Sequence, residues 1–184
     1  MEAFFVSALI VALGEIGDKT QLLALVLSAR YRQPVPIVIG ILVATLANHA
    51  LAGVAGEWLR SMMSPEVLRW SVGASFIGMG GWVLVPDRVE EPRRSTGRYG
   101  VFFVTLSAFF LAEMGDKTQF ATVALAAEYH ALIAVVAGTT LGMLLANVPV
   151  VSLAQRAAPR LPMRAIRFVA AALFVSLGLV VLAR

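Results

Sequence analysis

The sequence contains no cysteine and few charged residues. Only 14% of its 184 residues are charged and 59% are hydrophobic, against about 25% charged and about 45–50% apolar in soluble domains. Without cysteine there is no disulfide, no thiolate metal site and no cysteine nucleophile. So apolar a chain is not expected to fold in water, which argues against a soluble enzyme or a nucleic-acid-binding protein despite the net charge of +4. We expect membrane lipid and small ions as partners, and no nucleic acid.

Six apolar stretches are long enough to cross a bilayer, which takes about 20 residues in a helix. They occupy residues 3–28, 35–58, 66–85, 100–126, 131–154 and 164–183. The segments between them are short, and the longest, residues 86–98, is polar and rich in turn-forming residues, as in a linker. The sequence therefore predicts an all-α integral membrane protein with six transmembrane helices.

Arginines are concentrated on one side of this expected topology. Three arginines fall on the other side: Arg60, Arg69 and Arg184. Nine fall in or beside the first, third and fifth loops: Arg30, Arg32, Arg88, Arg93, Arg94, Arg98, Arg156, Arg160 and Arg164. Because cytoplasmic loops carry an excess of basic residues, the pattern predicts that both termini are extracytoplasmic.

The two halves of the chain repeat each other. The segment EIGDKTQ at residues 15–21 recurs as EMGDKTQ at residues 113–119, and the same offset pairs Gly40 with Gly138 and Phe76 with Phe174. We expect two three-helix repeats, residues 1–85 and 99–184, joined by a cytoplasmic linker at residues 86–98. Since three spans is an odd number, the second repeat enters the membrane from the opposite side, giving inverted repeats whose motifs meet at the bilayer midplane.

The repeated motif puts charges where charges are costly. Each one costs about 2.5–3.5 kcal/mol at the centre of a membrane helix, so these side chains are expected to face the interior and to serve a function. In a continuous helix, Glu15 and Asp18 project from one face, and Lys19 is placed for an intrahelical ion pair with Glu15. Gly17 either leaves room for a second helix or lets the helix loosen.

Four carboxylates from the two motifs are therefore the predicted metal ligands: Glu15, Asp18, Glu113 and Asp116. Together with two lysines they leave a charge of −2, which matches one divalent cation or two protons. The supporting or gating candidates are Lys19, Lys117, Thr20, Thr118, Gln21, Gln119, Asn48 and Asn147. For the two asparagines, completing the ion shell and bonding between helices are equally good interpretations.

Such a site suits two kinds of cargo. Oxygen ligands favour hard cations such as Ca²⁺, Mg²⁺ and Mn²⁺, and crowded carboxylates also hold protons because like charges disfavour simultaneous ionisation. We therefore expect exchange of a divalent cation for protons, with no tightly bound cofactor. Na⁺ as the counter-ion stays open, as does the choice between Mn²⁺ and Ca²⁺.

Three other interpretations compete. A channel could use the same carboxylates as a selectivity ring, and a Glu–Lys pair could merely lock helices together. An intramembrane aspartyl protease built on Asp18 and Asp116 fits poorly, because each has a lysine next in sequence and a glutamate nearby. The antiporter ranks first and the channel second.

The paired motif E-x-G-D-[KR]-[TS], once in each half of a six-helix inverted repeat, resembles the second calcium:cation antiporter family. That family includes Golgi manganese/calcium–proton exchangers and bacterial manganese exporters. The resemblance implies export of Mn²⁺ or Ca²⁺ with the motif acids as ligands. The short linker of mixed charge departs from the longer acidic one of eukaryotic relatives, which points to a prokaryotic plasma-membrane protein.

Overall fold

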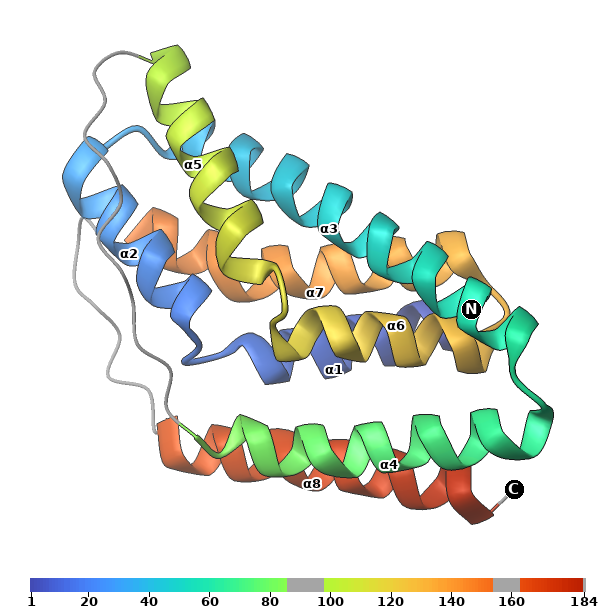
Figure 1. The fold of residues 1–184 in the computed structure, drawn as a ribbon. Coiled ribbons are helices and arrows are strands. Elements are labelled where there is room, and N and C mark those ends of the chain that lie inside the picture. The colour runs from blue at the N-terminus through green and yellow to red at the C-terminus, as the bar shows by residue number, and fades with distance from the viewer. Residues whose placement is uncertain (86–97, 154–162, 184) are drawn as a thin grey trace.

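The computed structural model describes residues 1–85, 98–153 and 163–183, and these form helices connected by short turns (Figure 1). The segment predicted as a linker, residues 86–98, lies outside the described residues except at its last position. The helices are α1 (Glu2–Glu15), α2 (Lys19–Tyr31), α3 (Pro34–Met62), α4 (Pro65–Val83), α5 (Arg98–Glu113), α6 (Lys117–Tyr129), α7 (Leu132–Leu153) and α8 (Met163–Ala183).

The first and fourth expected spans are not the continuous helices that the apolar runs predict. Each is broken at the repeated motif, into α1 and α2 and into α5 and α6, and the second pair is bent by 69°. Gly17 and Gly115 cause the breaks, since their φ angles of 82° and 72° lie in the left-handed region that glycine adopts without strain. Asp18 and Asp116 then stand in extended conformation as the N-caps of α2 and α6.

Length and hydropathy identify fewer crossings than the six expected. Among the residues that the structure describes, α3 and the Leu132–Ser152 part of α7 are long and apolar enough to cross a membrane. A third crossing results if α5 and α6 count as one bent span. The described residues are thus all-helical, with helices long and apolar enough for a membrane protein, while the six-span inverted topology stays a prediction.

Helices from the two halves pack against each other in matching pairs. Helix α1 packs on α7, and its counterpart α5 packs on α3. Helices α4 and α8 lie side by side as a separate layer below the others in Figure 1. Within that layer Phe76 contacts Phe174, its counterpart 98 residues later, with ring centroids 6.3 Å apart. The packing therefore relates the two halves by approximate two-fold symmetry.

Glycines set how closely the paired helices approach. A Cβ atom on Gly138 of α7 would lie 2.4 Å from the carbonyl oxygen of Phe4 in α1. In the counterpart pair, α3 with α5, a Cβ on Gly40 would lie 2.8 Å from Cβ of Thr105 and 3.1 Å from the carbonyl oxygen of Phe102. These close crossings fix α1 and α5, and with them the two helix breaks.

Candidate metal site at two helix breaks

The motif builds the same tight turn twice. The side-chain oxygen of Gln21 accepts a hydrogen bond of 2.8 Å from the backbone N–H of Gly17, and Gln119 does the same for Gly115 at 2.7 Å. The N–H of Asp18 donates to the carbonyl oxygen of Glu15 at 3.0 Å, as its counterpart does in the second copy. The two glutamines, predicted as supporting residues, thus stabilise the breaks.

Each glutamine also ties its break to the neighbouring long helix. The side-chain nitrogen of Gln21 donates to the carbonyl oxygen of Ala146 in α7 at 3.1 Å. That of Gln119 donates to the side-chain oxygen of Asn48 in α3 at 3.4 Å. Since Ala146 and Asn48 are 98 positions apart, the two contacts are counterparts, and they hold both breaks against the helices that cross them.

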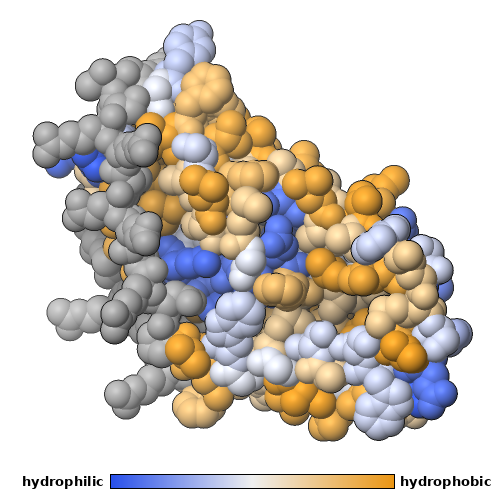
Figure 2. Space-filling model, viewed as in Figure 1, coloured by the Kyte–Doolittle hydropathy of each residue, from blue (hydrophilic) through white to orange (hydrophobic). Residues whose placement is uncertain are grey.

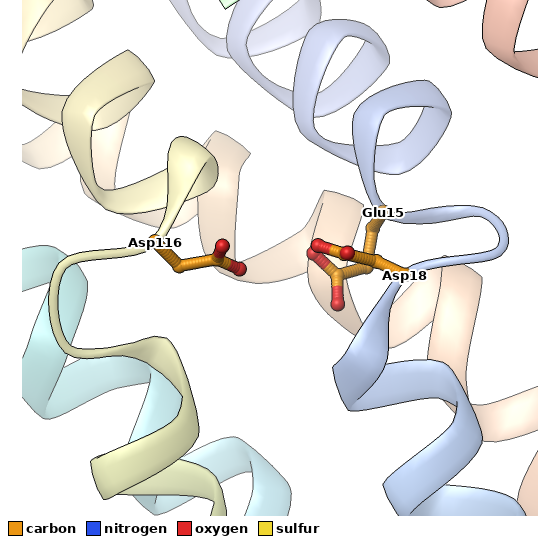
Figure 3. Close-up of side chains that lie close together, drawn as sticks. All are labelled: Glu15, Asp18 and Asp116. Atoms are coloured by element: carbon orange, nitrogen blue, oxygen red, sulfur yellow. The ribbon is translucent and has the colours of Figure 1, made fainter. Parts of the chain in front are cut away.

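Three of the four predicted ligands lie together. Glu15, Asp18 and Asp116 each offer a carboxylate oxygen, and these atoms lie within 4.8 Å of one another. Figure 3 shows Asp116 reaching from the break between α5 and α6 toward Glu15 and Asp18 at the other break. All three side chains are buried, with at most 2% of their surface exposed. Both halves thus contribute to one acidic cluster, the three-carboxylate cluster.

The lysines pair across the two halves. Nζ of Lys117 lies 2.7 Å from Oδ1 of Asp18, and Nζ of Lys19 lies 3.4 Å from Oδ1 of Asp116. The intrahelical pair expected between Lys19 and Glu15 is wrong, because the break between α1 and α2 removes the helical register on which it relied. Each half supplies a cation to the aspartate of the other.

Glu113 stands apart from the cluster. Its Oε1 accepts a hydrogen bond of 2.7 Å from the hydroxyl of Thr45, and its Oε2 accepts one of 3.3 Å from the amide of Asn48. The same amide donates to the carbonyl oxygen of Phe110 at 3.0 Å. In this structure α3 therefore holds the fourth predicted ligand with hydrogen bonds.

Several buried polar atoms at the site have no hydrogen-bond partner within the described part of the chain. Both carboxylate oxygens of Glu15 are among them, as are the hydroxyls of Thr20 and Thr118. Asn147 donates to its own helix at Met143, but its side-chain oxygen accepts nothing from the described residues. Because buried polar atoms are nearly always paired, open acceptors beside three carboxylates are what a cation site requires.

Sequence reasoning missed Thr45. A single threonine in an apolar helix carries little signal by itself, since its hydroxyl can bond within its own helix. Its position was the available clue, because it lies three residues before Asn48 and residues so spaced share one helix face. The polar face of α3 therefore comprises both residues that contact Glu113.

The surroundings of the site are mostly apolar. Figure 2 shows hydrophilic residues gathered in the middle of a largely hydrophobic face, over the region of the helix breaks in Figure 1. Ionisable residues in apolar helices pair, face the interior and mark ion pathways. Two broken helices that meet at buried carboxylates are also the pattern of membrane ion transporters. The fold and the site together define an integral membrane protein of the ion-transport class.

The comparisons with known proteins agree with this class. The family model described as "Divalent cation/proton antiporter GDT1" matches residues 3–91 and 101–184, stretches that correspond to the two halves of the repeat. The chain belongs to this family, and it is accordingly a transporter and not an enzyme. The resemblance found in the motif is confirmed.

Two relatives give the range of similarity. A Vibrio cholerae protein named "Putative manganese exporter" is 49% identical over 180 residues, which cover 97% of this chain and 90% of that protein. The Synechocystis "GDT1-like protein sll0615" is 26% identical over 163 residues, which cover 77% of this chain and 78% of that protein. No solved structure matches the chain significantly.

Proposed function

We propose that this protein exports Mn²⁺ in exchange for protons, by alternating access to the three-carboxylate cluster. One observation carries the proposal: Glu15, Asp18 and Asp116 converge from both halves of the repeat and are buried, and neither carboxylate oxygen of Glu15 is hydrogen-bonded within the described residues. Membership of a family of divalent cation/proton antiporters supports the reaction. The Vibrio cholerae relative, named as a manganese exporter, supports Mn²⁺ as the first cation to test.

The ligand chemistry fits a hard divalent cation. Mn²⁺ and Ca²⁺ both take carboxylate, amide and hydroxyl oxygens. The buried hydroxyls of Thr20 and Thr118 and the open side-chain oxygen of Asn147 are donors of this kind close to the motif. Ca²⁺ accepts more ligands at longer distances than smaller cations do, so direct competition between the two ions is the way to rank them.

Charge balance links cation and proton movement. With both lysines and all four motif acids charged, the site carries −2, and either one divalent cation or two protons neutralise it. Crowded carboxylates compete for a cation or for protons, because like charges disfavour simultaneous ionisation. The empty site takes up two protons before it reorients across the membrane, and it releases them when it binds the cation. The exchange is then electroneutral.

The proposed topology follows the pseudo-symmetric packing. Residues 1–85 and 99–184 form two inverted three-helix repeats joined by the linker at residues 86–98, with α1 plus α2 and α5 plus α6 as broken spans. The arginine distribution puts both termini outside the cytoplasm, and the bacterial relative supports the plasma membrane as the location.

This topology can be tested by labelling, because the chain has no cysteine of its own. Single cysteines in three turns serve as probes: Gln33→Cys between α2 and α3, Ser64→Cys between α3 and α4, and Ala131→Cys between α6 and α7. A membrane-impermeant maleimide applied outside should label the second and third but not the first. The opposite pattern would reverse the orientation, and labelling of all three would exclude the six-span arrangement.

The burial of the cluster favours a carrier over a channel. A selectivity ring lines an open water-filled path, whereas Glu15, Asp18 and Asp116 are almost fully enclosed and two ion pairs join the halves around them. A carrier must move one ion uphill when another runs downhill. A channel cannot.

The experiment uses purified full-length protein in liposomes with a pH-sensitive dye inside. External Mn²⁺ should drive protons out of the lumen, and an imposed proton gradient should concentrate Mn²⁺ against its own gradient. Glu15→Gln, Asp18→Asn and Asp116→Asn should abolish both fluxes. Glu66→Gln is the matched control, since Glu66 is exposed in the first turn of α4 and away from the motif.

The outcomes separate the alternatives. Mn²⁺ flux that is never accompanied by protons, and that carries current down its gradient, would establish the channel. Proton-coupled flux that is unchanged in Asp116→Asn would refute the proposed site. Coupling to Na⁺ in place of protons would keep the site and replace the counter-ion.

A further inference from the structure

The glutamates of the two motifs differ in their hydrogen bonds. Glu113 is bonded at both carboxylate oxygens by Thr45 and Asn48 of α3. Glu15, its counterpart, has neither oxygen bonded within the described residues and lies in the three-carboxylate cluster instead. One glutamate is therefore held by a long helix, and the other is available to a cation.

The sequence explains the difference. The residues that lie 98 positions after Thr45 and Asn48 are Met143 and Ala146, neither of which has a side-chain hydrogen-bond donor. They sit on the stretch of α7 that runs against the middle and second half of α1, since a Cβ on Gly142 would lie 2.5 Å from the carbonyl oxygen of Ala8 and 2.9 Å from the backbone nitrogen of Ala12. Asn147, the next residue, turns its amide nitrogen to the carbonyl oxygen of Met143 in its own helix. Among the described residues, α7 thus offers Glu15 no equivalent of the hydrogen-bond dock that α3 offers to Glu113.

The dock is part of a larger network. Asn48 donates to Glu113 and to the carbonyl oxygen of Phe110, while its side-chain oxygen accepts from Gln119. Gln119 in turn caps Gly115 at the break. The position of Glu113 is therefore fixed together with the turn that carries Asp116.

We propose that Thr45 and Asn48 are positioning residues that hold Glu113 out of the cation site and thereby set its affinity. This inference rests on the proposed function and adds a role that the motif itself does not define. With Glu113 docked, three carboxylates face the cation. With Glu113 released, a fourth carboxylate joins them and the cation is held more tightly, because affinity for hard cations rises with the number of charged ligands.

Docking is useful to a transporter because a bound ion must also leave. A site with four carboxylates would retain the cation, whereas a site with three lets it go on the far side of the membrane. A shift of Glu113 between dock and cluster would then separate tight binding from release. Thr45 is the cleaner residue to change, since its hydroxyl is bonded to Glu113 whereas Asn48 has three partners.

The test measures Mn²⁺ affinity by titration calorimetry and transport kinetics in liposomes, on full-length protein. Thr45→Val removes the hydroxyl and keeps the shape, so Kd should fall about fivefold or more as one bond to the charged Glu113 is lost. Both KM and kcat should fall, because release becomes slow. Thr45→Ser should restore wild-type values, and Thr45→Val combined with Glu113→Gln should lose the gain in affinity.

Two further variants test the asymmetry. Glu113→Gln alone should leave the Kd for Mn²⁺ within about twofold of wild type, since the docked glutamate is not counted among the ligands. Met143→Thr puts a hydroxyl on α7 at the position equivalent to Thr45, where it can bond Glu15, and should weaken binding, whereas Met143→Leu should not. Thr122→Val is the matched control for loss of a buried hydroxyl, since within the described part of the chain the Thr122 hydroxyl bonds its own helix at the carbonyl oxygen of Thr118.

The results distinguish this inference from the proposed function. Unchanged or weaker Mn²⁺ binding in folded Thr45→Val would overturn the docking role, provided that Asp116→Asn abolishes binding. If Thr45→Val does not fold, Glu113→Gln decides: a loss as large as that of Asp116→Asn makes Glu113 a ligand in the resting state and refutes docking. Full binding in Asp116→Asn would overturn the proposed site itself.

Discussion

Nζ of Lys117 lies 2.7 Å from Oδ1 of Asp18, and the two residues belong to different halves of the repeat. The symmetric pair, Lys19 with Asp116, is longer at 3.4 Å, and the side chain of Lys19 is 25% exposed against 3% for Lys117. Both pairs cross between the halves beside the three-carboxylate cluster. The site is therefore held together by two bridges of unequal burial.

Removing the buried cation should cost more than removing the partly exposed one. Lys117→Met leaves the enclosed Asp18 without its charge partner, for which a loss of about 3–5 kcal/mol in unfolding free energy is expected. Lys19→Met should cost less, because that pair is longer and the side chain of Lys19 is partly exposed. Denaturant unfolding of the purified protein in detergent micelles, without divalent cations, measures both. Equal losses in the two variants would contradict the assignment of unequal burial.

Mn²⁺ should stabilise the folded protein by binding to it. A ligand at 100 times its Kd adds about 2.7 kcal/mol to the free energy of unfolding, which is visible as a rise in the thermal unfolding temperature. Asp116→Asn and Glu15→Gln should remove the rise, and chelation of the metal should reverse it in the wild type. A rise of the same size in Asp116→Asn would place the stabilising cation elsewhere.

The helix break at Gly115 should depend on the backbone conformation of this residue and not on the space around it. A Cβ there would meet nothing within 4 Å, but φ is +72°, a conformation that costs an L-residue about 1–2 kcal/mol. Gly115→Ala should therefore destabilise by about that amount and reduce transport, while Gly115→Asn should be milder. Gly81→Ala in α4, which also meets nothing within 4 Å, is the control.

In that control the glycine lies in a helix, so alanine should be neutral or should stabilise by up to about 1 kcal/mol. Thermal unfolding of the variants, together with proton-coupled Mn²⁺ flux, tests the contrast. A Gly115→Ala protein as stable and as active as the wild type would mean that the break does not need a left-handed residue.

Much of the helical arrangement could be predicted from the sequence, because hydrophobic runs end where polar and turn-forming residues begin. The expected stretch 35–58 appears as Pro34–Met62, and the expected stretch 164–183 as Met163–Ala183. The breaks were not settled, because the motif lies inside long apolar runs, and loosening of the helix at Gly17 was only one of two interpretations. In hindsight, Gly17 followed by Asp18 is a helix-end signal joined to an N-cap signal.

The contents of the site were predictable, but its geometry was not. Glu15 and Asp18 do lie together, although through a turn and not along a helix face. The choice of partner for each lysine depends on how two distant breaks face each other, which the spacing within one motif cannot give. The docking of Glu113 by Thr45 likewise depends on the packing of α5 on α3.

Two of the close helix crossings should tolerate an added methyl group poorly. At Gly138 a Cβ would lie 2.4 Å from the carbonyl oxygen of Phe4, which is backbone and can move only with all of α1. At Gly40 the nearest atom is the side-chain Cβ of Thr105 at 2.8 Å. Overpacking costs about 1–3 kcal/mol, so Gly138→Ala should lie at the upper end of this range and Gly40→Ala below it.

The same displacement should reach the site. Helix α1 ends at Glu15, so moving it away from α7 shifts one ligand of the three-carboxylate cluster relative to Asp116. Gly138→Ala should therefore raise the Kd for Mn²⁺ as well as lower the unfolding temperature, whereas Gly78→Ala, in open space on α4, should do neither. Unfolding curves and calorimetric titrations on the same samples measure both. A Gly138→Ala protein with a lowered unfolding temperature but unchanged affinity would show that the α1–α7 crossing supports the fold without positioning Glu15.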